Sequence, residues 1–358
     1  MGNTLRIGII GAGSVARRIH APGLRLCEDV KIVAVADPDA EAAASLKAPE
    51  IHADYRELLA RPDVDAVVIA VPNNQHREIA LAALAAGKHT LCEKPLAMNA
   101  AEAEEMLEAA QKSGVIHMTA FTYGFTPSAR YLTHLVRQGE LGEIRSVRAA
   151  YLMALSKHLL GWRSRRELAG SGVLGDIGSH LIHIVLELAG DIKTLSARQK
   201  DFRKDPTSDV EDWIAFLAEF ENGACGTFEI SRVCPGRGAD VTEDMFIEIY
   251  GTKGGAVFSM QEPRALQVCL GARADEPANQ LERVQIPQDW WKLPGAPRHV
   301  SEGDPRWSYR FDQAWRFVSA IREGAAPEPS FEAGLRTQRV LDAALASAAS
   351  GAWTPVGA

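Results

Sequence analysis

Residues 5–16 read Leu-Arg-Ile-Gly-Ile-Ile-Gly-Ala-Gly-Ser-Val-Ala, a short apolar run that leads into a loop rich in small residues. Apolar runs of this length are typical of buried parallel strands. A helical pattern follows the loop and extends to about Cys27. The loop therefore lies between a strand and a helix, which is the setting that the dinucleotide-binding fingerprint requires.

The loop has the spacing Gly11-x-Gly13-x-x-Ala16. Glycine at 11 permits the tight turn, glycine at 13 lets the backbone approach a pyrophosphate, and a small residue at 16 packs the helix on the strand. The phosphates would rest on the helix N-terminus, whose free N–H groups favour an anion. We predict cofactor contacts from Gly11, Gly13, Ser14 and Val15. The alternative is a strand-to-helix turn that merely needs small residues.

Asp37 supports the prediction of a dinucleotide site and indicates which dinucleotide binds. It ends the second strand pattern, 24 residues after Gly13, near the spacing of about 20 expected for the acid that binds the cofactor ribose. Its carboxylate could accept both ribose hydroxyls of NAD and would repel the 2′-phosphate of NADP. The sequence favours NAD, with NADP as the alternative. A second interpretation is that Asp37 only caps the turn before the next helix.

The first third of the chain alternates strand and helix patterns. Strand patterns occupy residues 5–10, 31–36, 66–71, 89–92 and 115–120, and helical patterns occupy 74–86 and 100–112. Strands separated by helices imply right-handed crossovers and a doubly wound parallel sheet. We therefore predict an α/β Rossmann domain, which binds NAD(P), over residues 1–122.

The remaining residues predict a second domain, 123–358, for substrate binding and oligomerisation. Strand patterns at 145–155, 213–220, 226–233 and 245–250 have few helices between them, which favours an α+β domain with an open, mostly antiparallel sheet. Residues 271–306 are rich in Pro, Gly and charge and predict a long loop. The tail, 311–350, is largely helical, and its helix 331–350 could pack back on the Rossmann domain.

Composition excludes several functional classes. The 358 residues fit two domains, and 46% hydrophobic and 24% charged residues are ordinary for a globular protein. The formal net charge of −7 provides no basic field for nucleic acid or anionic lipid, and no apolar run is long enough to span a bilayer. The N-terminus lacks a signal-peptide pattern, and the five scattered cysteines indicate reduced thiols in the cytoplasm.

Lys94, Asp176 and His180 are the residues that suggest proton-transfer chemistry. Lys94 follows a strand, so it lies at the carboxyl edge of the sheet, where ligands of open α/β sheets bind. Asp176 and His180 are four residues apart, on one face of a predicted helix. Alternative readings are a surface lysine, an N-cap aspartate and a core histidine. His183 completes an HxxH pattern, but no third ligand is evident, so we predict no metal.

Six stretches of the chain carry a resemblance to a known family. They are Gly11-x-Gly13-x-x-Ala16, Val71-Pro72-Asn73-Asn74-Gln75-His76, residues 86–97 with Glu93-Lys94-Pro95, Gly161-Trp162-Arg163, residues 172–180 and Ile249-Tyr250-Gly251-Thr252-Lys253-Gly254. In this ordered set the chain resembles the Gfo/Idh/MocA oxidoreductases, a family that includes glucose–fructose oxidoreductase and inositol dehydrogenase. The resemblance runs along nearly the whole chain.

The resemblance implies a Rossmann domain, then an open mixed sheet, one face of which often makes a dimer contact. It thus implies a homo-oligomer, a dimer or tetramer, that binds a small sugar or polyol. By analogy Lys94 touches cofactor and substrate, Asp176 binds substrate, and His180 is the catalytic imidazole. The remaining residues implied for the cofactor or the substrate pocket are Pro72, Asn73, His76, Glu93, Tyr123, Trp162 and Arg163.

Two positions depart from the family pattern. The family often has His-x-x-Asp where this chain has His180-x-x-His183, and Tyr-Arg-Phe where it has Tyr123-Gly124-Phe125. These departures concern the sugar pocket more than the reaction type.

The main hypothesis is reversible oxidation of a secondary alcohol of a sugar, cyclitol or related polyol, with His180 as general base and Lys94 polarising the oxygen. One alternative is an NADPH-dependent sugar carbonyl reductase similar to anhydrofructose reductase, to which residues 158–163 show a weak resemblance. Two others are a glycosidase that works by transient oxidation with tightly held NAD, and a non-catalytic regulator that senses a dinucleotide.

Overall fold

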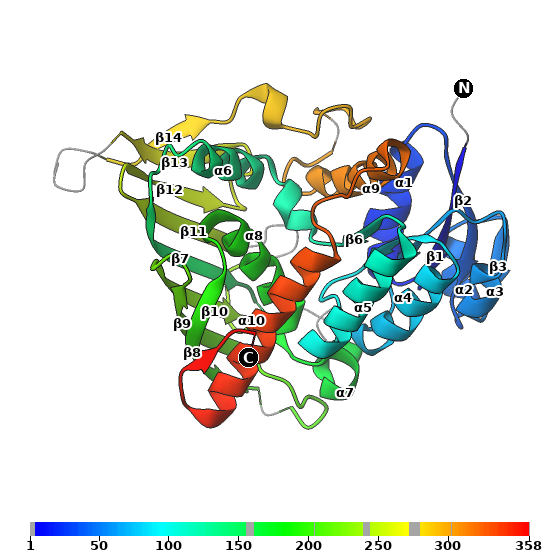
Figure 1. The fold of residues 1–358 in the computed structure, drawn as a ribbon, viewed down its shortest axis with the longest axis horizontal. Coiled ribbons are helices and arrows are strands. Elements are labelled where there is room, and N and C mark those ends of the chain that lie inside the picture. Colours follow the sequence, from blue (N-terminus) through cyan, green and yellow to red (C-terminus); the bar gives the residue numbers. More distant parts are fainter. Residues whose placement is uncertain are drawn as a thin grey trace. The chain divides into compact units, whose positions relative to one another are not determined.

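The protein is described by a computed structural model that covers residues 4–154, 161–203, 205–238, 244–271, 280–301 and 303–357. The chain divides into two compact units (Figure 1). Unit 1 comprises Met1–Phe121, Leu293–Glu302 and Arg310–Leu335, and unit 2 comprises Thr122–Lys292, Gly303–Tyr309 and Arg336–Ala358. The division falls at Phe121/Thr122 and cuts the last long helix after Leu335.

Unit 1 contains a six-stranded sheet in which every pairing is parallel. Its order is β3 (Glu50–His52), β2 (Val30–Ala36), β1 (Leu5–Ile10), β4 (Ala66–Ile69), β5 (His89–Cys92) and β6 (His117–Thr119). This order reverses direction at β1, so that β1 and β4 are neighbours. Ligands of doubly wound sheets bind beyond the carboxyl ends of the strands at such a switch point.

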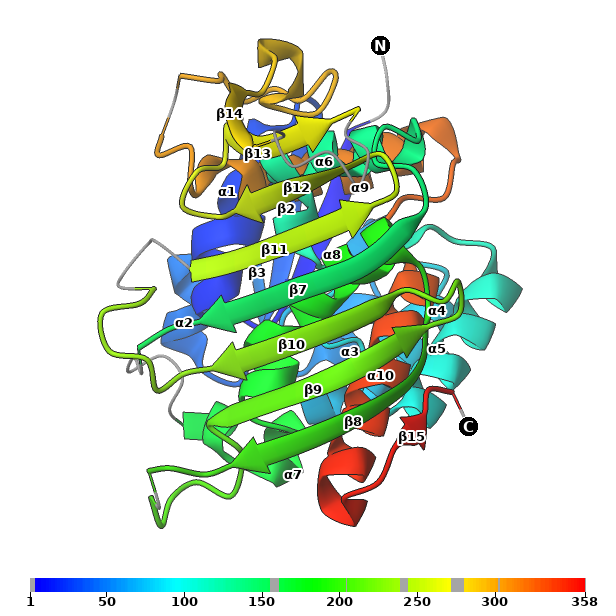
Figure 2. The same cartoon turned by 90° about the vertical axis from the view of Figure 1, so that its left-hand side faces the viewer.

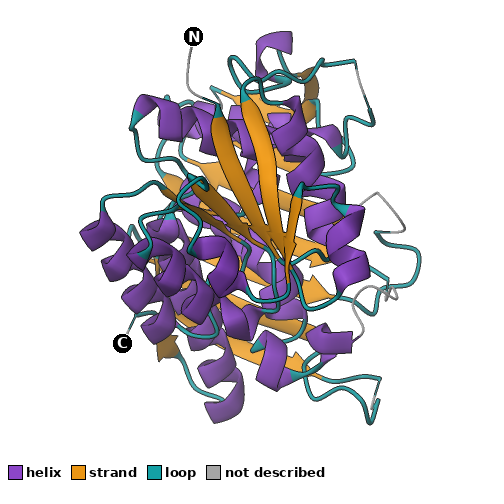
Figure 3. Cartoon of the chain, turned by 90° about the vertical axis from the view of Figure 1, so that its right-hand side faces the viewer, coloured by secondary structure: helices purple, strands orange, loops and turns teal. Residues whose placement is uncertain are grey.

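Helices of unit 1 cover this sheet (Figure 3). They are η1 (Ala16–His20), α1 (Ala21–Leu26), α2 (Ala40–Ser45), α3 (Tyr55–Leu59), η2 (Asn73–Gln75), α4 (His76–Ala85), α5 (Ala100–Ser113), α9 (Asp312–Glu323) and the first turn of α10 (Phe331–Ser350). The side chain of Asn99 caps α5 by accepting from Glu102 N–H, and Gly114 ends it at φ +69°. One apolar core joins strands, α4, α5 and Phe331.

Unit 2 contains a nine-stranded mixed sheet (Figure 2). Its order is β14 (Glu282–Gln285), β13 (Ala265–Leu270), β12 (Gly254–Ser259), β11 (Asp244–Gly251), β7 (Ile144–Leu152), β10 (Cys225–Ser231), β9 (Trp213–Phe220), β8 (Ile192–Lys200) and β15 (Thr354–Pro355). Only β7 and β10 pair in parallel; the other pairings are antiparallel.

One face of this sheet is covered by helices and the other is open. Along β9, Ile214, Phe216, Ala218 and Phe220 are buried and the residues between them are more exposed. The helical elements of the unit are η3 (Thr122–Phe125), α6 (Pro127–Arg137), η5 (Gly161–Ser164), α7 (Arg166–Ala169), η6 (Leu174–Gly178), α8 (Ser179–Ala189), η7 (Gln288–Trp290), η8 (Ser308–Phe311, which crosses the unit boundary) and the rest of α10. Almost every residue of α8 is buried, and α8 packs on β7 and α6.

The segment Arg166–Ala189 is long and apolar enough to span a membrane by length and composition alone. Its apolar window is 89% buried inside the protein, as expected of the core helix of a folded domain. The expectation that no apolar run has this length is therefore wrong for this segment, which joins α7, the glycine-rich turn, η6 and α8.

The structure corrects the sequence analysis at several strands. The short edge strand β3, with only Glu50–His52, was not predicted, nor were β8, β12, β13 and β15. β8 is rich in polar residues, and β12 begins with two glycines, so neither has a strong strand pattern. The predicted loop 271–306 contains β14 and η7, while 272–279 lie outside the described residues.

Candidate active site

The glycine loop of unit 1 has the geometry that a dinucleotide needs. Gly11 adopts φ +93°, and a Cβ there would lie 2.4 Å from the carbonyl oxygen of Ala70. Nothing lies within 4 Å of a Cβ built on Gly13, and Gly13 and Ser14 are exposed. The turn therefore requires glycine at 11, whereas position 13 leaves backbone open to an approaching phosphate.

Asp37 is tied to this loop. One of its carboxylate oxygens accepts the N–H of Ala12 at 2.7 Å, and the other accepts the N–H of Asp39 at 2.8 Å. A carboxylate oxygen accepts more than one hydrogen bond, so acceptor capacity remains for ribose hydroxyls. The open loop and the acid beside it fit NAD. The turn-capping role considered for Asp37 is also present, and the two roles do not compete.

Glu93 and Lys94 follow β5 at the carboxyl edge of the sheet of unit 1. Glu93 is buried, and its Oε1 lies 2.7 Å from Nε2 of His20, which is also buried. The other oxygen of Glu93 accepts the N–H of Lys94 at 3.2 Å. Although burial opposes ionisation, the hydrogen bond from His20 and the charges of His20 and Lys94 lower the pKa of Glu93. The half-buried Lys94 thus follows a negatively charged residue that is fixed in the core.

His76 holds the peptide that follows Lys94. Its ring is buried, with Nδ1 2.9 Å from the carbonyl oxygen of Pro95 and Nε2 3.1 Å from that of Val71. Burial lowers the pKa of His76, so the ring is neutral and donates to only one of the two carbonyls at a time. Pro72 and the buried Asn73 lie directly before it, at the start of η2. His76 therefore fixes the backbone near Lys94 by a hydrogen bond to the carbonyl oxygen of Pro95 or of Val71.

Unit 2 brings Asp176 and Arg163 together. Arg163 Nε lies 3.3 Å from Oδ1 of Asp176, and the guanidinium lies 4.2 Å from the ring centroid of Trp162. All three side chains are partly exposed. An aromatic face, a guanidinium and a carboxylate in one place are suited to a polyhydroxylated ligand, because they offer donors and acceptors beside an apolar surface.

His180 is packed against Tyr123. The two ring centroids are 4.0 Å apart, and His180 lies in the first turn of α8. The hydroxyl of Tyr123 lies 3.2 Å from that of Tyr151, a residue of β7 with 1% of its surface exposed. Tyr123 thus fixes the imidazole plane and is itself anchored on the sheet.

The two departures from the family pattern are neighbours in unit 2. A Cβ on Gly124 would lie 3.7 Å from Nε2 of His183. Burial, with the charge of Arg336, lowers the pKa of His183 to about 3, so its ring is neutral. The arginine and aspartate that the family often has here would carry opposite charges, and this chain replaces both with uncharged groups. Among the described residues no group of three His, Cys, Asp or Glu side chains could hold a metal ion.

Two residues that the sequence analysis missed support these groups. His20 pairs with Glu93, as described above. Glu211 accepts the N–H groups of Gly172 and Leu174, directly before Asp176. The signals available in the sequence were a histidine in the first turns after the glycine loop, and an acidic pair directly before an apolar strand. Neither signal identifies a partner.

Comparison with known proteins identifies the family. Residues 5–121 match the oxidoreductase family model with an NAD-binding Rossmann fold, and residues 129–257 match the GFO/IDH/MocA C-terminal domain. The chain belongs to the GFO/IDH/MocA oxidoreductase family. This confirms the predicted fold class, the NAD-binding Rossmann domain and the oxidoreductase class.

Several relatives are dehydrogenases that act on sugars. The chain is 31% identical to levoglucosan dehydrogenase of Pseudarthrobacter phenanthrenivorans, over 98% of each chain. It is 33% identical to D-glucoside 3-dehydrogenase of Escherichia coli over 70% of this chain and 76% of that protein. A solved structure of levoglucosan dehydrogenase with NADH and levoglucosan has a TM-score of 0.88 and 30% identity, and covers 99% of this chain and 100% of that one.

Proposed function

We propose that this chain is an NAD-dependent dehydrogenase that oxidises a secondary alcohol of a sugar, cyclitol or related polyol. The observation that carries the proposal is that one chain has both an NAD-type loop with Asp37 and, in unit 2, the polar side chains Asp176, paired with Arg163, and His180, packed on Tyr123. It matches sugar dehydrogenases along nearly its whole length. Uncharged groups at positions 124 and 183 are compatible with a neutral sugar.

NAD, when bound, supplies a nicotinamide C4 that accepts the hydride of the alcohol carbon. The residues that would hold it are Gly11, Gly13, Ser14, Val15, Asp37, Pro72, Asn73, Trp162 and Arg163. Glu93 and His76 are buried and would support these residues from the core of unit 1. Asp37 would bind the ribose hydroxyls, and the exposed backbone at Gly13 would bind the pyrophosphate.

Side chains of the protein accept the proton of the alcohol and stabilise its oxygen. His180 takes it as general base, and Lys94 donates a hydrogen bond to the same oxygen, which stabilises the negative charge that develops there. Asp176, oriented by Arg163, accepts a neighbouring hydroxyl, and Tyr123 holds the imidazole plane. The substrate loses one hydride and one proton, so the product is a ketone.

The direct test is NADH formation, followed at about 340 nm, with a panel of anhydrosugars, glucosides, aldoses and inositols. We expect activity with NAD and at least one uncharged sugar. Turnover with NADP alone, or no turnover with any polyol while the protein binds NAD, would contradict the proposal.

A second candidate is reduction of a sugar carbonyl with NADPH. It is favoured by 30% identity over 70% of the chain to 1,5-anhydro-D-fructose reductase of Ensifer adhaerens. Of residues 158–163, the sequence feature considered for it, 158–160 lie outside the described residues. Comparing NAD and NADP affinity decides between the two, because Asp37 repels a 2′-phosphate.

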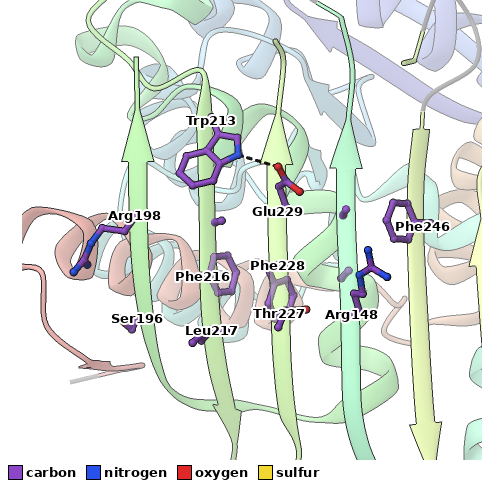
Figure 4. Close-up of a pocket in the computed structure, with 13 residues that line it drawn as sticks. Arg148, Ser196, Arg198, Trp213, Phe216, Leu217, Thr227, Phe228, Glu229 and Phe246 are labelled. Atoms are coloured by element: carbon purple, nitrogen blue, oxygen red, sulfur yellow. Dashed lines mark hydrogen bonds between the residues drawn. The ribbon is translucent and has the colours of Figure 1, made fainter. Parts of the chain in front are cut away.

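We propose further that the enzyme is cytoplasmic and forms a dimer or tetramer through the open face of the nine-stranded sheet. All five cysteines are free thiols. The open face presents Trp213, Leu217 (53% exposed) and Glu229, with Trp213 Nε1 donating to Glu229 at 3.0 Å (Figure 4). Light scattering should show an oligomer that Leu217→Lys dissociates, whereas the exposed Ile51→Lys in unit 1 should not.

A further inference from the structure

We propose that Glu211 is a positioning residue for the substrate-binding groups, because its buried side chain holds the turn that carries Asp176 and His180. The proposal rests on the proposed function for its catalytic consequences. Glu211 has 3% of its surface exposed and stands two residues before β9.

The contacts of Glu211 fall on three successive residues of the glycine-rich segment. Its Oε1 accepts the N–H of Gly172 at 2.8 Å and that of Leu174 at 3.1 Å. Its own backbone carbonyl accepts the N–H of Val173 at 3.1 Å. A single residue thus binds the amide groups that η6 leaves unpaired at its start.

The segment fits this partner closely. A Cβ on Gly172 would lie 2.2 Å from the backbone oxygen of Glu211, so only glycine permits the approach. The N–H of Asp176 donates to the carbonyl of Gly172 at 3.1 Å, and Gly175 N–H donates to the hydroxyl of Ser171 at 3.0 Å. A shift at Gly172 is therefore passed directly to Asp176.

The residue that follows Glu211 in the chain is also held by buried hydrogen bonds. Asp212, the next residue, is fully buried and accepts from Nε of Arg232 at 2.8 Å and from Nε of Arg203 at 2.6 Å. This clamp holds the start of β9, so that Glu211 is a rigid reference point. Burial raises the pKa of Glu211, while the amides it binds oppose that effect.

The carboxylate uses only one oxygen for these bonds. Oε2 of Glu211 is buried and has no hydrogen-bond partner in the described part of the chain. A glutamine at 211 would retain the carbonyl oxygen that accepts both amides. An aspartate would retain the charge but withdraw the oxygens by one carbon–carbon bond, about 1.5 Å. Glu211→Gln and Glu211→Asp therefore separate the position of the acceptor from its charge.

The experiment compares kcat, KM for the best sugar of the panel and Kd for NAD in wild type, Glu211→Gln, Glu211→Asp and a control. Ser347→Ala is the matched control, because Ser347 is fully buried in unit 2 and its hydroxyl accepts from the N–H of Ala197 and donates to the carbonyl oxygen of Ala352, both backbone groups. We expect Glu211→Asp to lower kcat/KM by about 10- to 100-fold, since η6 loses two hydrogen bonds to a buried acceptor. Glu211→Gln should remain within about threefold of wild type and Ser347→Ala within about twofold. Every variant should bind NAD with close to wild-type affinity, because most of the residues proposed to hold NAD, the glycine loop and Asp37 among them, belong to unit 1.

Two results would overturn the proposal. One is a folded Glu211→Asp with wild-type kcat/KM. The other is a loss in Ser347→Ala as large as that in Glu211→Asp at the same loss of melting temperature, which would make the effect a general one of stability.

A second readout does not depend on turnover, so a failure of the proposed function is distinguishable. The ring protons of His180 lie against the face of Tyr123 and should show a ring-current shift in NMR spectra, assigned with His180→Gln. We expect Glu211→Asp to reduce this shift and Glu211→Gln to preserve it. An unchanged shift in Glu211→Asp would contradict the positioning role even if no substrate were found.

Discussion

The Lys94 loop of unit 1 and the Asp176–His180 helix of unit 2 are both held by buried titratable side chains, but in different ways. Near Lys94 the support is a pair of side chains, His20 and Glu93, 2.7 Å apart. Near Asp176 it is one carboxylate, Glu211, that binds backbone amides. The first support depends on a hydrogen bond between two buried side chains, one of them a carboxylate. The second depends on where one acceptor atom lies.

This contrast has an energetic consequence. Removing one partner of a buried ion pair leaves an uncompensated charge, which is costly. Moving an acceptor away from backbone amides costs less but shifts the segment that it holds. We therefore expect substitution of His20 or Glu93 to lower stability more than catalysis. A shift of the Glu211 carboxylate should lower catalysis more than stability.

The largest expected effects come from the two groups that we propose act on the substrate. Lys94→Ala and His180→Ala should each lower kcat by about 10²–10⁴-fold, because each removes a positioned proton-transfer or polarising group. Steady-state NADH formation measures this. His180→Ala should bind NAD with wild-type affinity, which serves as the control for folding. Near-full turnover in either variant would show that the residue is not catalytic.

The next effect tests the ion pair. His20→Ala should lower the free energy of unfolding by about 3–5 kcal/mol, because Glu93 stays buried without its partner. His20→Gln keeps a donor near Glu93 and should recover part of the loss. Urea unfolding of wild type and both variants gives the comparison. If His20→Ala and His20→Gln were equally stable, the bond to Glu93 would not be what stabilises this region.

A smaller effect is expected at the ribose acid. Asp37→Ser should weaken NAD binding by about 10- to 100-fold and narrow the preference over NADP, since one or two hydrogen bonds to a charged group are lost. Thermal-shift titration with each cofactor measures the affinities. Because Asp37 also accepts the N–H of Ala12, Asp37→Asn is a useful companion that keeps this acceptor. Wild-type preference for NADP would reverse the assignment of the cofactor.

The last expected effect concerns His183 and is small near neutral pH. Its pKa falls from an ordinary 6.5 to about 3 in the folded chain, so the unfolded chain binds the proton more readily. Stability should therefore decrease as pH falls below 6.5, by roughly 1.4 kcal/mol per pH unit at most, and stop decreasing near pH 3. His183→Gln should remove this dependence between pH 7 and 5, measured by melting temperature. An identical pH dependence in the variant would mean that other groups cause it.

Much of unit 1 could be predicted from the sequence because its signals are local. β1, β5 and the helix over 100–112 follow directly from apolar runs and from Asn99 and Gly114 at the helix ends. Unit 2 was harder. β8 and β14 carry many polar residues because one face of the sheet is open, so their alternation is weak.

The candidate site divides in the same way. Lys94, Asp176 and His180 lie within short motifs and could be named from the sequence. Their supports could not, because His20 lies 73 residues from Glu93 in the chain and Glu211 lies 39 residues from Gly172. Only folding brings these pairs together, and no local pattern identifies which residue will be the partner.

The central claim is that Lys94 and His180 act on one alcohol of a sugar whose hydride goes to NAD. A crystal structure of the enzyme with NADH and the best substrate of the panel tests it most directly. The account predicts Nζ of Lys94 and a ring nitrogen of His180 within hydrogen-bond distance of the same hydroxyl, on the carbon that faces the nicotinamide. A sugar bound with either group on a different hydroxyl, or out of reach, would contradict it.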